Sequence, residues 1–235
     1  MDQIGTAGWS VPSVVADRFP SEGSILERYA AVLSAVEINT TFYRPHRPAT
    51  FERWAASTPP DFRFAVKAPK TVTHEKRLTD ADELMAAFLG QVRHLGEKLG
   101  PVLIRLPPNL KFTPNAARFV ARWRRHHDGP TVIEPRHATW FTQEVEAQLA
   151  DTRIARAAAD PAVVPLAAAP GGWTGLTYIR LHGSPRMYAS PYSPEQIAAV
   201  AATLAARPVG TEGWCIFDNT MHGAAAANAL ELAAL

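Results

Sequence analysis

The chain has 235 residues, of which 47% are hydrophobic, 9% aromatic and 20% charged. This is the composition of an ordinary globular protein, and it excludes a disordered chain, collagen and a coiled coil. The count of Lys and Arg, 24, barely exceeds the count of Asp and Glu, 22, so net charge alone does not indicate a nucleic acid or a membrane as a partner. The 14 glycines and 20 prolines are spread along the chain. We therefore expect one domain over residues 1–235.

The cysteine content and the first residues indicate the compartment. A single cysteine, Cys215, makes neither an internal disulfide nor a cysteine-based zinc site. The opening MDQIGTAGWS lacks the basic start and the apolar stretch of a secretory signal, and no long uncharged apolar run follows. We therefore expect a cytoplasmic protein without a membrane partner.

Short apolar runs that are typical of buried strands recur along the chain. Most are continuous rather than alternating, as expected for parallel strands that are buried on both faces. In chain order they cover residues 3–10, 35–43, 63–69, 101–108, 131–137, 153–161, 176–183 and 214–220.

Segments with helical signals lie between these runs. Capping patterns at Thr79-Asp80, Thr113-Pro114 and Ser193-Pro194 predict helices over 81–99, 115–127 and 195–207, and the alanine-rich segment 222–235 suits a last helix. The alternation predicts an α/β fold, a single (β/α)8 TIM-like barrel, with a doubly wound open sheet as the alternative. Prolines and glycines between Asp160 and Thr177 predict that the helix between strands six and seven is missing or reduced.

Polar residues collect at the C-terminal ends of the predicted strands, where barrel enzymes place their catalytic groups. Alternate residues of a strand share a face, so the charges of one strand end point the same way. Charged groups inside a barrel are costly unless a ligand or a structural ion pair compensates them. The candidate catalytic residues are Glu37, Glu134, His137 and His182, and the candidate substrate-binding residues are Trp9, Asn39, Tyr43, Lys67, His74, Arg136, Trp140, Arg180, Asp218 and Asn219.

Several motifs in a fixed order make the sequence resemble a known family. The runs GTAGWS, LGPVLIRLPP, IEPRHATW, YIRLHG and FDNTMHGAAAANAL resemble the YecE-like barrel family, a domain family of unknown function, over nearly the whole chain. The resemblance implies a TIM-like barrel with a polar pocket at the strand ends, and it supplies no activity. The chain departs from the family pattern at Arg105, where we expect glutamine, and at Asp218-Asn219, where consecutive asparagines are frequent.

The candidate residues favour a small-molecule enzyme that acts on an anionic or polyhydroxylated substrate. Lys67, Arg136 and Arg180 would hold negative charge, and Glu134 or His137 would move a proton. We predict in particular that Arg136 and Arg180 converge on an anion at the mouth of the barrel, because both lie in similar patterns on alternate strands. The two histidines that follow these arginines in sequence would assist.

Two other functions fit the same residues. A non-catalytic module would use the pocket only to bind a ligand. A metal-assisted phosphodiesterase or nucleic-acid-binding protein would hold a divalent ion with carboxylates and histidines, but lysines and arginines interleaved with the carboxylates predict no tightly held metal. The sequence identifies no cofactor and no oligomeric state. The ligands of that alternative metal site would be Glu37, Glu134, His137, His182 and Asp218.

Overall fold

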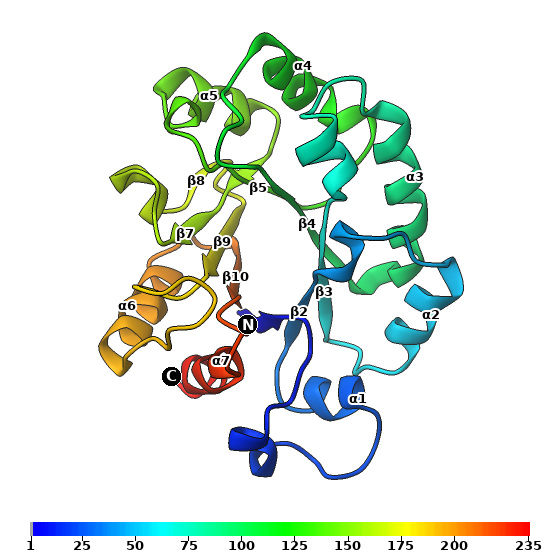
Figure 1. Ribbon diagram of the computed structural model, residues 1–235, viewed down its shortest axis with the longest axis vertical. Helices are drawn as coiled ribbons and strands as arrows, with labels where there is room; N and C mark the ends of the chain where they lie inside the picture. Colours follow the sequence, from blue (N-terminus) through cyan, green and yellow to red (C-terminus); the bar gives the residue numbers. More distant parts are fainter. Residues whose placement is uncertain (1) are drawn as a thin grey trace.

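Ten strands form one mixed sheet that curves into a barrel, with the helices around it (Figure 1). The structure is a computed structural model and describes residues 2–235. The order of neighbouring strands is β7-β9-β10-β1-β2-β3-β4-β5-β6-β8. The strands are β1 (Gln3–Ala7), β2 (Ala35–Ile38), β3 (Arg63–Lys67), β4 (Leu99–Arg105), β5 (Thr131–Glu134), β6 (Ala155–Arg156), β7 (Ala158–Asp160), β8 (Gly171–Gly172), β9 (Leu176–Leu181) and β10 (Glu212–Phe217).

The predicted sixth strand, 153–161, is divided into β6 and β7 at Ala157. β6 pairs with β5, β7 pairs with β9, and both pairings are parallel. The chain through Ala157 therefore joins the two halves of the sheet, and this nearly closes the barrel. β9 pairs with β7 and not with β6, so the second edge of β6 is open to another strand. The short strand β8 pairs with this edge in the antiparallel direction. The described sheet thus differs from the predicted set of eight parallel strands by this division and this addition.

Seven α-helices lie outside the sheet. They are α1 (Ile25–Ala30), α2 (Pro48–Ala56), α3 (Asp82–Val92), α4 (Pro114–Arg122), α5 (Gln143–Asp151), α6 (Pro194–Ala205) and α7 (Ala224–Ala233) within residues 2–235. Short 3-10 turns cover Ser13–Arg18, Thr40–Phe42, Arg93–Lys98, Trp123–Arg125, Ala138–Trp140 and Pro165–Ala168, and a π turn covers Thr71–Glu75.

The connection between β7 and β9 has no α-helix, in agreement with the prediction for the segment after Asp160. It contains only the 3-10 turn Pro165–Ala168 and the two residues of β8. The helix predicted over 81–99 is shorter than expected: α3 ends at Val92, and a 3-10 turn follows in which Gly96 has a φ of 61°. Such a backbone conformation is left-handed and interrupts a helix.

Helix starts follow the predicted capping patterns in two of three cases. Ser193 and Gln196 form the capping box of α6, and the Thr113 hydroxyl accepts a hydrogen bond from the first turn of α4. The prediction of a helix cap at Thr79-Asp80 is wrong, because α3 begins after Ala81 and has no side-chain cap. None of the described helices has the length and apolar character needed to cross a membrane.

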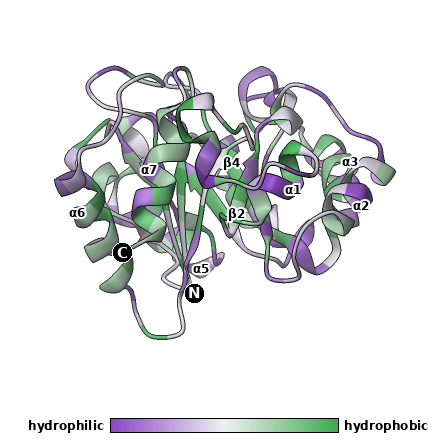
Figure 2. Cartoon of the chain, turned by 90° about the horizontal axis from the view of Figure 1, so that it is seen from below, coloured by the Kyte–Doolittle hydropathy of each residue, from purple (hydrophilic) through white to green (hydrophobic). Residues whose placement is uncertain are grey.

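Apolar side chains fill two regions, one between the sheet and the helices and one inside the barrel. Figure 2 shows hydrophobic colours on the central strands, whereas much of the hydrophilic colour lies on loops and helix ends. Inside the barrel, the Trp214 ring stacks on Tyr178 with 6.0 Å between ring centroids. A Cβ at Gly100 would lie 2.6 Å from the Trp214 ring, so glycine is required beside it. The inner cluster includes Ala35, Ala65, Leu103, Val132, Ala155, Tyr178, Trp214 and Ile216.

Candidate functional site

A layer of charged side chains lies directly above the apolar interior of the barrel. Each of its members follows an interior residue of the same strand by two positions, and side chains two positions apart share a face of a strand. The sequence therefore places these charges in the barrel at the C-terminal ends of the strands, where TIM-like barrels carry their sites. The members are Glu37, Lys67, Arg105, Glu134, Arg180 and Asp218.

Arg180 is the centre of this layer and has no exposed surface. Its Nε donates to Glu37 Oε2 at 3.0 Å, and its Nη2 donates to Glu37 Oε1 at 2.7 Å, a two-pronged pairing. Nη2 also lies 2.9 Å from Asp218 Oδ2, and Nη1 donates to Glu134 Oε2 at 3.3 Å. Three carboxylates thus surround one guanidinium group. The carboxylates hold the pKa of Arg180 well above its ordinary value, although burial opposes them.

His182 connects two of these carboxylates. Its Nε2 lies 2.9 Å from Glu134 Oε1, and its Nδ1 lies 3.1 Å from Asp218 Oδ2. Burial by itself would raise the pKa of both carboxyl groups, but the neighbouring His182 and Arg180 outweigh it. The pKa of Glu134 lies well below its ordinary value, and the pKa of Asp218 is lowered to about 2. Both side chains are therefore ionised at neutral pH.

Tyr178 belongs to the same network, although the sequence interpretation omitted it. Its hydroxyl donates to Glu37 Oε2 at 3.0 Å, and burial together with Glu37 raises the pKa of this hydroxyl well above its ordinary value. Tyr178 therefore remains a hydrogen-bond donor. The signal was present in the sequence, because Tyr178 lies two residues before Arg180 on the same face of the strand.

Lys67 lies at the end of β3 without an ion pair to any described residue, 2–235. It is 6% exposed; its Nζ donates to Asn39 Oδ1 at 3.0 Å and lies 4.5 Å from the centre of the Phe42 ring. Burial lowers the pKa of Lys67 to about 8, and nearby Arg180 contributes. A buried lysine with so few polar contacts is costly for stability, which is common at functional sites.

We expect the substitution Lys67→Met to raise the free energy of unfolding, by about 1 kcal/mol, because it removes this poorly compensated charge and keeps the apolar stem. Chemical unfolding at pH 7 measures the change. Lys70→Met, on an exposed lysine that pairs with Glu75 at 3.2 Å, is the control and should change stability by less than about 1 kcal/mol. A clear loss of stability in Lys67→Met would show instead that the amine supports the fold.

Arg105 and Arg136 lie beside the network and use few of their donors. Arg105 Nε and Arg136 Nη1 lie 3.5 Å and 3.4 Å from the same atom, Glu134 Oε1. Arg105 Nη2 donates to the Tyr188 hydroxyl at 3.2 Å, and Arg136 Nη1 donates to the Pro161 carbonyl at 3.4 Å. Arg105 Nε is buried and makes no hydrogen bond within residues 2–235. The sequence interpretation gave Arg105 no role, because it departs from the family pattern.

The pairing of Arg136 with Arg180 on one anion stays a prediction, and the two arginines have different partners in the structure. The carboxylates of Glu37, Asp218 and Glu134 already occupy the guanidinium of Arg180. Among the described residues, the guanidinium of Arg136 instead forms hydrogen bonds to Glu134 and to the Pro161 carbonyl. The structure therefore places Arg180 in an internal ion network and leaves Arg136, Arg105 and Lys67 as the cations with donors to spare.

His74 and Tyr43 lie next to Phe42, the ring that contacts Lys67. Both rings meet Phe42 edge to face with centroids 5.0 Å apart. His74 is half-buried, and burial, then Arg105 and Lys67, lower its pKa. Tyr43 is 69% exposed. Its predicted role in substrate binding stays a prediction.

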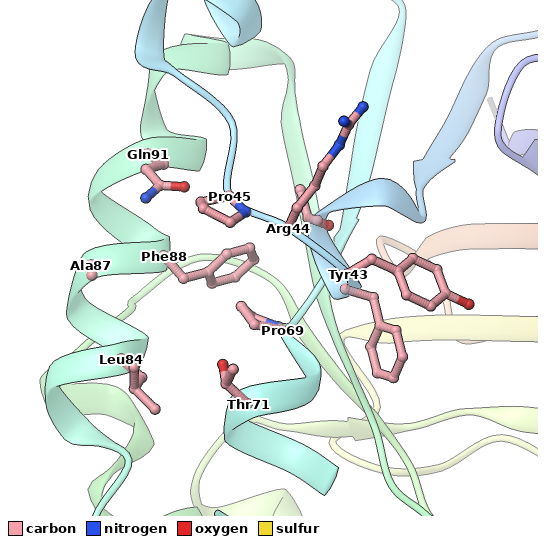
Figure 3. A pocket seen from close by; sticks show the side chains of 11 residues that line it. Tyr43, Arg44, Pro45, Pro69, Thr71, Leu84, Ala87, Phe88 and Gln91 are labelled. Atoms are coloured by element: carbon pink, nitrogen blue, oxygen red, sulfur yellow. The ribbon is translucent and has the colours of Figure 1, made fainter. Parts of the chain in front are cut away.

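A mostly apolar cavity of about 280 Å³ is lined by the segment 41–45 that follows β2 and by helix α3. Figure 3 shows Leu84 and Phe88 of α3 facing Pro45 and Pro69 across it. Phe42 lines this cavity as well as contacting Lys67. The cavity thus adjoins the charged layer through one aromatic ring.

Three further predicted site residues, His137, Asn219 and Trp9, make their contacts outside the network. His137 Nδ1 accepts a hydrogen bond from Thr139 N at 3.2 Å and caps a turn. Asn219 is fully buried and donates to Ser190 O and Asn228 Oδ1, both at 3.0 Å, so it links loops and α7. Trp9 packs edge to face on Trp54.

Trp140 does not line the mouth, contrary to the prediction. It has no exposed surface, its Nε1 donates to the Leu110 carbonyl at 2.9 Å, and its ring packs against Phe112. The indole is therefore a packing group whose polar atom is satisfied by the backbone.

The carboxylates of the alternative metal site do converge, but they converge on a guanidinium group. Glu37, Glu134 and Asp218 are held by Arg180, and no group of three or more metal-ligating residues within 2–235 has the geometry to hold an ion. His137, the remaining proposed ligand, caps its own turn. The three carboxylates thus share a cation of the protein itself as their partner.

Comparison with known proteins gives a family match over nearly the whole chain. Residues 3–235 match the family described as "Protein of unknown function DUF72". The UPF0759 protein YecE of Escherichia coli (strain K12) is 33% identical over 152 residues, 63% of this chain and 53% of that protein. The UPF0759 protein YunF of Bacillus subtilis (strain 168) is 28% identical over 151 residues, 60% of this chain and 53% of that protein. The matched region thus spans about half the length of these curated relatives, and the YecE-like resemblance is confirmed.

Two solved structures share the fold. A DUF72 family protein of Thermotoga maritima MSB8 has a TM-score of 0.82 and 27% identity, and the match covers 100% of this chain and 98% of that one. A DUF72 family protein of Enterococcus faecalis V583 has a TM-score of 0.83 and 21% identity, with 99% and 94% covered. The α/β, barrel-shaped architecture is therefore shared with both.

Proposed function

The chain belongs to the DUF72 family of proteins of unknown function, and we propose that it is an enzyme for a small anionic or polyhydroxylated substrate. We place the substrate at the C-terminal mouth of a TIM-like barrel, in which β6 and β7 together count as one strand. The observation that carries the proposal is the set of three cations with spare donors at the ends of successive strands: Lys67, Arg105 and Arg136.

Charge balance supports an anionic ligand. The site contains three carboxylates, those of Glu37, Glu134 and Asp218. It contains four basic side chains, because Arg180 adds to the three named above. Because the pKa of Lys67 is about 8, most of Lys67 is protonated at pH 7, and one positive charge is then left over. Guanidinium groups that are partly desolvated and incompletely paired bind carboxylate or phosphate strongly.

The inner network would give this site rigidity. Arg180 fixes Glu37, Glu134 and Asp218 relative to one another, and Glu134 Oε1 in turn contacts Arg105 and Arg136. Binding groups that are held in place before the substrate arrives stabilise charge without reorganising. In this proposal Glu134 positions Arg105 and Arg136, and it remains an ionised carboxylate rather than moving a proton.

Inorganic phosphate tests the anion site. At a phosphate concentration of about ten times the dissociation constant, the free energy of unfolding of the wild-type protein should rise by about 1.4 kcal/mol. We expect Arg105→Met and Arg136→Met each to reduce this gain, because each removes spare donors, and the double variant to abolish it. Thermal unfolding with and without phosphate, at constant ionic strength, measures the effect.

Arg122→Met is the matched control, because its side chain is 52% exposed and lies 4.0 Å from Asp82 outside the barrel. It should keep the full phosphate response. A wild-type protein that phosphate does not stabilise, or a double variant that keeps the response, would contradict the proposed site.

Turnover separates an enzyme from a non-catalytic binding module. Wild-type protein and the Arg105/Arg136 double variant would each be incubated with a panel of phosphorylated sugars, and the products followed by NMR. The proposal expects chemical change of at least one sugar with the wild-type protein and at least a tenfold slower change with the double variant. Phosphate binding without any turnover would favour the binding module.

A further inference from the structure

Lys67 differs from the other lysines of the chain in its surroundings. The chain has five lysines, at positions 67, 70, 76, 98 and 111. Lys98 is the useful comparison, because its Nζ donates to the Ala55 carbonyl at 2.6 Å and to the Thr58 carbonyl at 2.5 Å. Burial and Arg63 lower the pKa of Lys98 as well, but these carbonyl acceptors satisfy its amine. Lys67 Nζ makes only one hydrogen bond within residues 2–235, to Asn39.

Burial and the neighbouring arginines lower the pKa of Lys67. Burial has the largest effect on its pKa, Arg180 and Arg105 act in the same direction, and Glu37 and Asp218 act in the opposite one. His74 lies in the π turn Thr71–Glu75 after β3, and its ring packs on Phe42, the ring that Lys67 Nζ contacts. The resulting pKa of about 8 means that a substantial fraction of Lys67 is unprotonated near pH 8. An unprotonated lysine is a nucleophile.

The position of Lys67 suits a carbonyl substrate. Lys67 is the last residue of β3, and it pairs in the sheet with Leu103 of β4, two residues before Arg105. Resting on the function proposed above, we infer that Lys67 Nζ forms a Schiff base with the carbonyl carbon of an anionic aldehyde or ketone held by Arg105 and Arg136. Asn39 would direct the amine, and Phe42 would shield it from water.

The step balances without a cofactor. The lone pair of Nζ forms a bond to the carbonyl carbon, and the π electrons of C=O move to the oxygen, which takes a proton. The nitrogen loses one proton in forming the neutral carbinolamine. The hydroxyl then takes up a second proton and leaves as water, while the nitrogen lone pair forms the C=N bond of the iminium ion. The sum is amine, carbonyl and one proton giving iminium and water, and the iminium withdraws electrons from the neighbouring carbon.

Reductive trapping tests the inference. Wild-type protein would be incubated at pH 8 with glyceraldehyde 3-phosphate and sodium cyanoborohydride. Reduction of the imine adds the mass of the probe less one oxygen atom, and peptide mapping locates it. We expect Lys67 to be labelled at least ten times faster than Lys98 or Lys70, and Lys67→Arg to lose this fast labelling. Lys70→Arg is the matched control and should keep it.

The charge on the probe separates this inference from the proposed anion site. Arg105→Met and Arg136→Met should slow labelling of Lys67 by glyceraldehyde 3-phosphate much more than labelling by uncharged glyceraldehyde. Labelling of Lys67 no faster than that of Lys98 or Lys70 with either probe would overturn the Schiff base, even if phosphate still stabilises the protein. Fast labelling by both probes, without stabilisation by phosphate, would instead support the reactive lysine and contradict the anion site.

Discussion

Replacing Arg180 with methionine should lower the free energy of unfolding by about 3–5 kcal/mol, because removal of one partner leaves buried charges uncompensated. Arg180 has no exposed surface and contacts the carboxylates of Glu37, Asp218 and Glu134. Without it these carboxylates would face one another inside the barrel, with His182 between two of them. Urea unfolding followed by circular dichroism measures the loss.

Two further variants make this expectation specific. Arg180→Lys keeps the charge but not the two-pronged bond to Glu37, so it should recover part of the stability. Lys70→Met removes an exposed pair, with side chains 45% and 54% exposed, and should cost less than about 1 kcal/mol. If Arg180→Met costs no more than Lys70→Met, the network does not support the fold.

Stability should also fall steeply in acid, between about pH 5 and pH 2. The pKa of Asp218 is about 2 in the folded protein, against about 3.9 for an aspartate in an unfolded chain. The unfolded state therefore binds more protons in this range, so the free energy of unfolding rises with pH and is lost as the pH falls. One such group contributes about 2–3 kcal/mol at neutral pH. The lowered pKa of Glu134 acts in the same direction.

Urea unfolding at a series of pH values measures this slope. Asp218→Asn removes one of the two shifted groups, so its stability should depend less steeply on pH below 5 than that of the wild-type protein. Asp128→Asn, on a side chain that is 88% exposed, should leave the slope unchanged. Parallel curves for wild type and Asp218→Asn would contradict the assignment of this acid sensitivity to the network.

The repetition of strands and the positions of their polar ends could be predicted from local patterns. Continuous apolar runs indicate strands buried on both faces, and the period of two along a strand places Glu37, Glu134 and Arg180 on the inner face. The missing helix before β9 also follows from local chemistry, because prolines and glycines after Asp160 do not support a helix. These features depend on residues close together in the sequence.

The division of the sixth strand at Ala157 and the role of Trp140 were not predictable in this way. β6 and β7 separate because one pairs with β5 and the other with β9, which lie on opposite sides of the division. Trp140 is buried against Phe112, and the carbonyl of Leu110, 30 residues earlier in the sequence, accepts its N–H. Both outcomes depend on neighbours that only the closed barrel brings together.

The sequence by itself determined that acids and bases would meet at one end of a barrel, because parallel strands bring their C-terminal ends to the same edge. Only the tertiary structure decided which charges compensate one another. Arg136 and Arg180 lie in similar local patterns, yet Arg180 reaches Glu37, 143 residues away, while Arg136 contacts Glu134 two residues away. The physical reason is distance across the barrel: a buried guanidinium group is stabilised by whichever carboxylates lie within hydrogen-bonding reach, and that reach is a property of the closed sheet.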